Sequence, residues 1–148
     1  MLFFLVATAV LLLDQISKYF AVKHLAFDAP AQVIDDFFDL ALVYNPGAAF
    51  GIFANQRLLF FLFTVISIAV IFYVTAKHTK GKKGLNLIIG TILGGILGNF
   101  MDRIRLGYVV DFLDFHIRGY HWPAFNVADS AICIGIGILA ILIIKDKK

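Results

Sequence analysis

Long apolar runs separated by short polar connections divide the chain into four predicted membrane-spanning helices. A helix rises about 1.5 Å per residue, so about 20 apolar residues cross a hydrocarbon core of about 30 Å. The runs cover residues of about 2–20, 58–76, 85–103 and 123–144, and a single acid, Asp129, interrupts the last. We therefore expect an all-α membrane fold, a four-transmembrane-helix bundle that forms one integral-membrane domain over all 148 residues (1–148).

Two connections between these runs carry the alternation of a β-strand. Residues 38–44 (FDLALVY) predict one strand. The Asn-Pro-Gly sequence at 45–47 predicts a turn after it, because Pro fixes φ and Gly accepts a positive φ. Residues 48–53 are expected to return as a second strand, and residues 108–117 also alternate. These pieces predict a small β-sheet on the outer membrane surface.

The charged residues indicate how the bundle is oriented. The connection 77–83 (KHTKGKK) is rich in lysine and holds no acid, and lysines also close the chain, whereas the connection 21–57 carries several aspartates. Because positive charge accumulates on the cytoplasmic side, we expect 77–83 and both termini in the cytoplasm and the β-sheet to be extracytoplasmic. With 61% hydrophobic and only 16% charged residues, the chain is not a soluble domain. The net charge of +3 therefore reflects topology and predicts no nucleic-acid partner.

The third run carries a repeated small residue, which indicates close helix packing. Glycine recurs every four residues, at Gly90, Gly94 and Gly98. This pattern lets a neighbouring membrane helix approach closely. Gly95, Asn99 and Asp102 follow one another on the adjacent face. Packing explains the glycines, but it does not explain why Asn99 and Asp102 point the same way from a membrane helix.

Polar residues gather at one depth in the predicted bundle. Asp14 lies about 20 Å along the outward-running first helix, and Lys18 follows on the same face, so we expect an ion pair. Further polar residues stand at the outer ends of the third and fourth helices and on the outer connections, namely Asn99, Asp102, Arg103, Asn126, Asp129, Asn45, Asp111 and His121. An unpaired polar group near lipid costs a few kcal/mol, so this clustering indicates a functional site.

Several of these residues also have a purely structural interpretation. Asp14 and Lys18 can serve stability alone, since removing one partner strands the other. Arg103 can simply extend to the lipid headgroups. His116 and His121 match no zinc-ligand spacing, so we expect no metal site and two solvated or interfacial histidines.

The remaining acids and the cysteine also divide into residues that a structural role explains and residues that it does not. We expect a solvated acidic face from Asp28, Asp35, Asp36 and Asp39. Cys133 falls inside an apolar run, which predicts a buried and inert thiol. Asp111 lies on a strand face that is otherwise apolar, whereas Asp114 shares the opposite face with His116. Asp111 and the helical Asp129 are therefore the acids that a structural role explains least.

Two neighbouring carboxyl groups suit one kind of chemistry. They cannot easily both ionise, so one stays protonated. The ionised group can take a proton from water while the protonated group donates to a carbonyl oxygen or a leaving amine. This is aspartic-protease chemistry, and it requires no metal, cofactor or nucleophilic side chain. A proton-coupled transporter and a non-catalytic membrane scaffold are the alternatives, although the polar residues of a transporter would continue to the cytoplasmic side.

Four segments of the chain together resemble the lipoprotein signal peptidases of bacteria, also called signal peptidase II. They are DQISK (14–18), NPGAAFGIF (45–53), GGILGNFMDRIRLGYVVDF (94–112) and FNVADSAI (125–132). The resemblance runs from residue 14 to about residue 137 and covers all four spans in order. It implies that Asp111 and Asp129 are the catalytic dyad of an intramembrane aspartic endopeptidase.

The resemblance implies further site residues and a cellular setting. Positions that the family uses to shape the site or hold substrate match Asp14, Lys18, Asn45, Gly95, Asn99, Arg103, Asn126 and Ala128. The implied enzyme is a multi-pass protein of the bacterial plasma (inner) membrane whose active site lies near the outer leaflet. Its implied partners are membrane lipid and prolipoproteins, which it cleaves just before a diacylglyceryl-modified cysteine, and no cofactor is implied.

We also expect particular contacts with such a substrate. The side chains of Asn45, Asn99 and Asn126 can hydrogen-bond an extended peptide backbone that lipid cannot satisfy. An aromatic surface for the lipid would come from Phe50, Phe53, Phe112 and Phe115.

Overall fold

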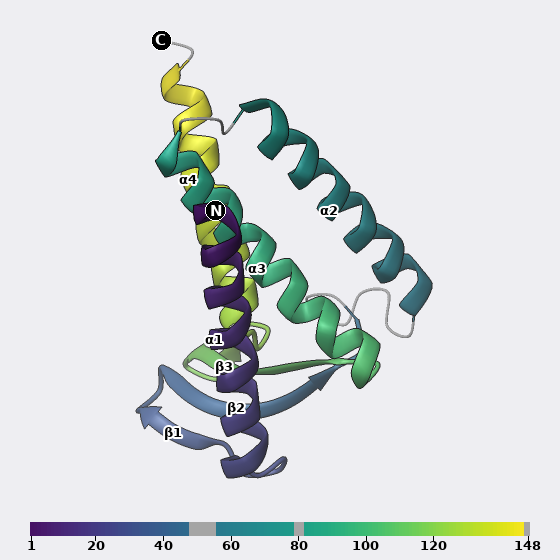
Figure 1. The fold of residues 1–148 in the computed structure, drawn as a ribbon. Coiled ribbons are helices and arrows are strands. Elements are labelled where there is room, and N and C mark those ends of the chain that lie inside the picture. The colour runs from purple at the N-terminus through teal and green to yellow at the C-terminus, as the bar shows by residue number, and fades with distance from the viewer. Residues whose placement is uncertain (48–55, 79–81, 147–148) are drawn as a thin grey trace.

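In the computed structural model, four apolar helices stand on a small antiparallel sheet (Figure 1). The structure describes residues 1–47, 56–78 and 82–146. The helices are α1 (Leu2–His24), α2 (Arg57–His78), α3 (Lys83–Arg105) and α4 (Val127–Asp146). Each is long and apolar enough to cross a bilayer, so the predicted four-helix fold is confirmed.

The sheet is a meander in chain order. Its strands are β1 (Ala31–Ile34), β2 (Phe38–Asn45), β3 (Val109–Ile117) and β4 (Tyr120–His121), and each pairs antiparallel with the next. The strands predicted over 38–44 and 108–117 are β2 and β3, and they pair with each other. β1 and β4 were not predicted, because one is fully exposed and the other has only 2 residues. The strand expected over 48–53 lies outside the described residues.

Glycines bring α1 and α4 against α3, as their spacing predicts. A Cβ atom added at Gly90 would lie 2.7 Å from the backbone oxygen of Phe3, and one at Gly94 would lie 2.6 Å from that of Ala7. On the other side of α3, a Cβ at Gly95 would lie 2.5 Å from the backbone oxygen of Ala128. These approaches are too close for any side chain, so the three helices form one tight group.

The outer surface of the helices is apolar and therefore suits lipid. Large side chains such as Phe63, Ile66 and Ile141 are exposed, whereas Asp14 and Lys18 are buried among the helices. α2 stands to one side of the other three helices (Figure 1) and packs mainly on α3. The bundle thus buries a charged group together with its apolar core and exposes further apolar side chains where a soluble protein would expose polar ones.

The fourth helix begins at Val127 and not near Pro123, for two reasons. The preceding residues join the sheet, where Phe125 N donates to Leu113 O at 3.1 Å and Phe125 O accepts from Leu113 N at 2.9 Å. Asn126 then caps the helix, because its side-chain oxygen accepts a hydrogen bond from the backbone amide of Asp129 at 2.9 Å. The start of α4 is therefore tied to strand β3.

Candidate active site

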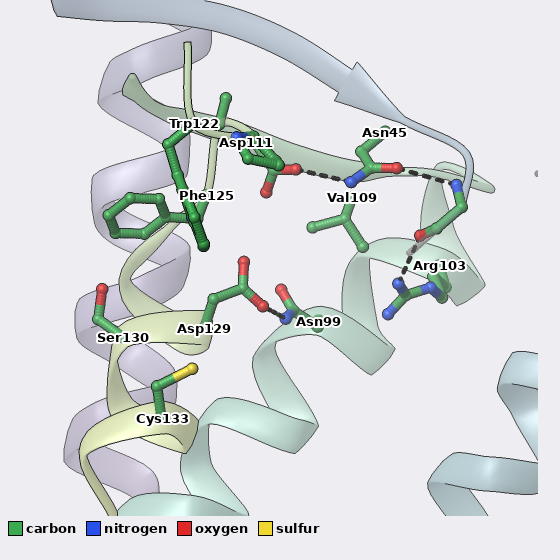
Figure 2. Close-up of a pocket in the computed structure, with 13 residues that line it drawn as sticks. Asn45, Asn99, Arg103, Val109, Asp111, Trp122, Phe125, Asp129, Ser130 and Cys133 are labelled. Atoms are coloured by element: carbon green, nitrogen blue, oxygen red, sulfur yellow. Dashed lines mark hydrogen bonds between the residues drawn. The ribbon is translucent and has the colours of Figure 1, made fainter. Parts of the chain in front are cut away.

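A cavity of about 420 Å³ opens where the sheet meets the adjoining ends of α3 and α4 (Figure 2). It is lined by Asn45, Gly47, Asn99, Arg103, Val109, Asp111, Trp122, Pro123, Ala124, Phe125, Asp129, Ser130 and Cys133. Asp111 faces it from the sheet and Asp129 from the helix. The two acids that the sequence singled out thus share one cavity, although they come from different elements.

Asp111 is held near the start of β3 by two asparagines. Its Oδ2 atom accepts a hydrogen bond from Asn45 Nδ2 at 3.0 Å, and its Oδ1 atom accepts one from Asn126 Nδ2 at 2.6 Å. The residue is only 2% exposed. Burial raises the pKa of Asp111 from 3.8 to about 7, and the nearby charge of Asp129 adds to this rise. The hydrogen bonds from the asparagines oppose it and keep the pKa from rising further.

Asp129 lies in the first turn of α4, where it takes part in the helix cap. Its Oδ2 atom accepts a hydrogen bond from the backbone amide of Asn126 at 3.3 Å, while Asn126 Oδ1 accepts from the Asp129 amide. This reciprocal pair is a capping box. The other oxygen, Oδ1, accepts from Asn99 Nδ2 at 2.7 Å (Figure 2). Both oxygens of the carboxylate are therefore held by hydrogen bonds, at the N-terminus of α4.

Lys18 is the buried centre of a polar cluster behind the cavity. Its Nζ atom lies 2.9 Å from Asp14 Oδ2, 2.8 Å from Asp102 Oδ2 and 2.9 Å from Asn99 Oδ1. An ammonium group has three protons, so all of them are used. The predicted Asp14–Lys18 ion pair is confirmed, and Asp102 joins it from α3. We call Asp14, Lys18 and Asp102 the ion cluster.

The ion cluster also holds the backbone next to each candidate carboxylate. Asp14 Oδ1 accepts a hydrogen bond from the backbone amide of Ala128 at 2.9 Å, and Ala128 directly precedes Asp129. Asp102 Oδ2 accepts one from the amide of Val110 at 3.2 Å, and Val110 directly precedes Asp111. The positions of both carboxylates therefore depend on buried charges that belong to α1 and α3.

Arg103 does not extend to the headgroups, which was its structural alternative. It lines the cavity, donates from Nη2 to the backbone oxygen of Gly47 at 3.1 Å, and lies 4.5 Å from the centre of the Phe60 ring. It thus connects α3 with the end of the turn after β2 and with α2. After β2 the chain bends at Pro46 and Gly47, where Gly47 N donates to Asn45 Oδ1 at 3.0 Å.

Other predicted site residues take supporting positions. Gly95 and Ala128 pack against each other and do not line the cavity. Asn126 is fully buried, and its Nδ2 atom also lies 3.1 Å from Asn99 Oδ1. The side-chain amides of Asn45, Asn99 and Asn126 are all directed at the two carboxylates. They orient the acids, and contact of these three amides with a peptide backbone stays a prediction.

The histidines and the remaining acids lie outside the cavity. His121 Nδ1 is 2.8 Å from Asp114 Oδ2, so His121 does not belong to the site cluster in which its depth had placed it. His116 Nε2 is 3.3 Å from Asp39 Oδ2, and Asp39 is therefore not part of a solvated face. The other acids of that segment are exposed as predicted, namely Asp28, Asp35 and Asp36.

Several cavity residues were missed or misassigned from the sequence. Cys133 is exposed and lines the cavity, so the prediction of a buried thiol was wrong. It lies one helical turn after Asp129, and this i+4 spacing places both on one face of α4. Trp122 and Phe125 supply the aromatic lining, whereas Phe112 and Phe115 do not line the cavity. Phe50 and Phe53 lie outside the part of the chain that the structure describes.

The arrangement can support acid–base chemistry on a water molecule. Two carboxyl groups face one cavity with room for a peptide segment, and Asp111 has a pKa near neutrality. A group with such a pKa can hold a proton at neutral pH and give it up during a reaction. Asp129 supplies a second carboxyl group on the opposite wall, whose oxygens accept hydrogen bonds from amide donors.

The sequence is similar to a known peptidase family and to its members. Residues 6–145 match the family described as signal peptidase (SPase) II. A lipoprotein signal peptidase of Syntrophotalea carbinolica is 47% identical over 139 residues, which are 91% of this chain and 86% of that protein. One from Halalkalibacterium halodurans is 40% identical over 148 residues, which are 100% of this chain and 95% of that protein.

Solved structures share the fold. A bacterial membrane enzyme at 2.3 Å resolution superposes with a TM-score of 0.90 at 35% identity, over 97% of this chain and 88% of that one. A second, at 1.9 Å resolution, has a TM-score of 0.86 at 35% identity, over 96% of this chain and 92% of that one. Sequence and fold therefore point to the same group of membrane enzymes.

Proposed function

The chain belongs to the signal peptidase II family, and from that membership we propose that Asp111 and Asp129 are the catalytic pair with which it cleaves. Its activity is that of an aspartic-type signal peptidase, which removes signal peptides from prolipoproteins. The observation that carries the residue assignment is that both carboxyl groups line one cavity, each fixed by an asparagine amide. The four-helix membrane fold supports an intramembrane reaction.

In the proposed reaction, a water molecule lies between the two carboxyl groups. The ionised group takes a proton from this water as the water oxygen bonds to the scissile carbonyl carbon. The protonated group first donates to the carbonyl oxygen. The C–N bond then breaks as the group that took the proton from water passes it to the leaving amine. Asp111, with its pKa of about 7, suits the role of proton carrier near neutral pH, although the proton belongs to the pair.

The orientation of the enzyme in the membrane is also part of the proposal. Lys77, Lys83 and Lys145 lie at the ends of helices away from the sheet, which favours that side as the cytoplasmic one. Both termini would then be cytoplasmic, the sheet extracytoplasmic, and the active site near the outer leaflet. A reporter fused after Lys80 should be cytoplasmic and one fused after His24 outside, and the reverse result would overturn this topology.

The substrate we propose is a prolipoprotein with a diacylglyceryl-modified cysteine, cleaved just before that cysteine. A signal peptide is itself an apolar helix, so a site between membrane helices meets the scissile bond without extracting it. Trp122, Phe125 and Val109 give the cavity apolar walls that suit a lipid-bearing residue. Arg103 also lines the cavity, and its guanidinium group can donate to a peptide carbonyl.

Cleavage of purified protein substrates tests this function. The full-length protein should cleave a lipidated prolipoprotein and should leave the unlipidated precursor largely intact. Equal cleavage of both would remove the lipid requirement, and cleavage of neither would remove the proposed activity. The transporter alternative predicts no cleavage, and the residues that the structure describes do not favour it, because the buried charges stop at the sheet end of the bundle.

A further inference from the structure

Lys18 is too far back in the bundle to line the cavity, yet it touches a residue that does. Its third proton goes to Asn99 Oδ1 at 2.9 Å, and the same amide group donates from Nδ2 to Asp129 Oδ1 at 2.7 Å. A primary amide has an acceptor end and a donor end, and the two differ little in shape. What faces Asp129 therefore depends on what faces the other end of the amide.

The partner on the far side of Asn99 leaves only one choice. An ammonium group donates and never accepts, so it can face only the oxygen end of the amide. We propose that Lys18 is a positioning residue for the catalytic pair, which fixes the Asn99 amide so that its NH2 group always points at Asp129. The inference rests on the proposed function, since it concerns how one member of that pair is kept ready.

The orientation of the Asn99 amide matters because its two ends favour opposite protonation states of the Asp129 carboxyl group. The NH2 end stabilises an ionised carboxylate, whereas the oxygen end can pair only with a carboxyl group that carries a proton. Without Lys18, the amide can rotate and present its oxygen to Asp129. Asn126 Nδ2 also donates to Asn99 Oδ1, at 3.1 Å, but its two protons have two other acceptors, Asp111 Oδ1 at 2.6 Å and Val110 O at 3.2 Å. Asn126 can therefore give up its bond to Asn99, whereas Lys18 has no other acceptor for its third proton among the residues that the structure describes.

Other charges also act on the pair, so its protonation does not depend on Lys18 alone. They come from α1 and α3 and are Asp14, Lys18 and Arg103, with Asp102 paired to Lys18. Removing Lys18 takes away a positive charge as well as the amide constraint, and both changes make the ionised form of the pair less favourable. Only the amide effect requires Asn99, and this difference allows the two to be separated.

The pH dependence of cleavage measures the proposed role. In the full-length protein, Lys18→Met should move the acidic limb of the kcat/KM profile to higher pH by about one unit or more. Lys18→Met should cause a clearly smaller shift when it is made in an Asn99→Leu protein, because no amide remains to be oriented. Equal shifts in the two backgrounds would mean that Lys18 acts by charge alone and would overturn the proposal.

Gln15 provides a matched control for loss of the ion cluster. Its Nε2 atom donates to Asp102 Oδ1 at 3.0 Å and to Asp14 Oδ2 at 3.2 Å, but it has no bond to Asn99. Gln15→Leu should lower the melting temperature and leave the acidic limb in place. A limb that moves as far as in Lys18→Met would assign the effect to general loosening and would overturn the proposal.

A second variant covers the case in which Lys18→Met does not fold. In Asp14→Asn/Lys18→Met/Asp102→Asn the cluster is neutral, and its amide oxygens can still accept from the amides of Ala128 and Val110. This protein should fold and show the shifted limb, and a failure to fold here too would make Lys18 purely structural. Turnover by Asp129→Asn would show instead that the proposed catalytic pair is wrong, a result independent of Lys18.

Discussion

Asn126 and Asp129 hold each other: the side-chain oxygen of Asn126 accepts from the Asp129 amide at 2.9 Å, and Asp129 Oδ2 accepts from the Asn126 amide at 3.3 Å. Asp129 is therefore both a candidate catalytic acid and part of the cap of α4. These two roles respond differently to substitution, because the cap needs only an acceptor oxygen, whereas catalysis needs an ionisable group. Asn supplies the first and lacks the second.

Asp129→Asn and Asp111→Asn should each abolish nearly all turnover while the protein stays folded. Neither asparagine can act as a base or carry the acid's proton. The double variant should be about as inactive as either single one, because the two groups act as a unit. Cleavage of a lipidated prolipoprotein, at matched expression, measures this effect. Substantial turnover by Asp129→Asn would rule out the pair. Asp129→Ala, which also lacks the capping oxygen, should in addition lose about 1 kcal/mol of folding stability.

The stability of the protein should fall as pH rises toward neutrality, because of Asp111. The pKa of Asp111 is about 7 in the folded protein against 3.8 for an ordinary carboxyl group. The folded state therefore binds the proton more tightly, and the stability this gives is complete below about pH 4 and is lost as pH rises through about 7. A rise of about 3 units corresponds to a loss of about 4 kcal/mol at most. Melting temperatures in detergent from pH 4 to pH 8 should fall for the wild type more than for Asp111→Asn, and parallel curves would contradict the assignment.

Asp114→Asn should retain most of the cleavage activity. Asp114 lies in the same strand as Asp111 but pairs with His121 at 2.8 Å and does not line the cavity. Asn keeps the size of the side chain and can still bond to the histidine. The assay compares initial rates of Asp114→Asn and Asp111→Asn on the same substrate. Equal loss of activity in the two would show that Asp114 takes part in the reaction.

Gly95→Ala should impair activity more than a comparable substitution elsewhere in the bundle. The added Cβ would lie 2.5 Å from the backbone oxygen of Ala128, so the start of α4 and Asp129 with it must move. Gly137→Ala is the matched control. It also replaces a helical glycine, but the added Cβ meets nothing within 4 Å. We expect a loss of at least tenfold in kcat/KM for Gly95→Ala, because small displacements of catalytic groups are costly, and little change for Gly137→Ala. Similar activity in both variants would mean that this contact does not position Asp129.

The sequence was informative where structure depends on near neighbours. Apolar runs predicted the four helices, alternation predicted β2 and β3, and i, i+4 spacing predicted the Asp14–Lys18 pair. The start of α4 was also readable in principle, because Asn126 and Asp129 have the spacing of a capping box. Pro123 belongs to the segment that joins the sheet, and hydropathy alone could not reveal this.

The contacts that complete the site depend on residues far apart in the chain. Nothing near Lys18 in the sequence indicates that Asp102 and Asn99 will share its ammonium group, since these come from another helix. Cys133 was misassigned because apolar surroundings predict burial only in a protein that has a water-facing surface. In this bundle an apolar helix faces lipid on one side and the cavity on another, so its hydropathy does not tell which residues are enclosed.

The i, i+4 spacing of Asp14 and Lys18 bears on how the protein is assembled during synthesis. α1 leaves the ribosome before α3, so at first Lys18 has neither Asp102 nor Asn99 as a partner. The neighbouring Asp14 makes the pair neutral within α1, and we expect this to ease entry of the helix into the bilayer. When α3 arrives, Asp102 adds its charge to the pair, and the two helices are joined by an attraction that lipid cannot replace. The ion cluster behind the active site is thus assembled in two steps, first the pair within α1 and then its contacts with α3.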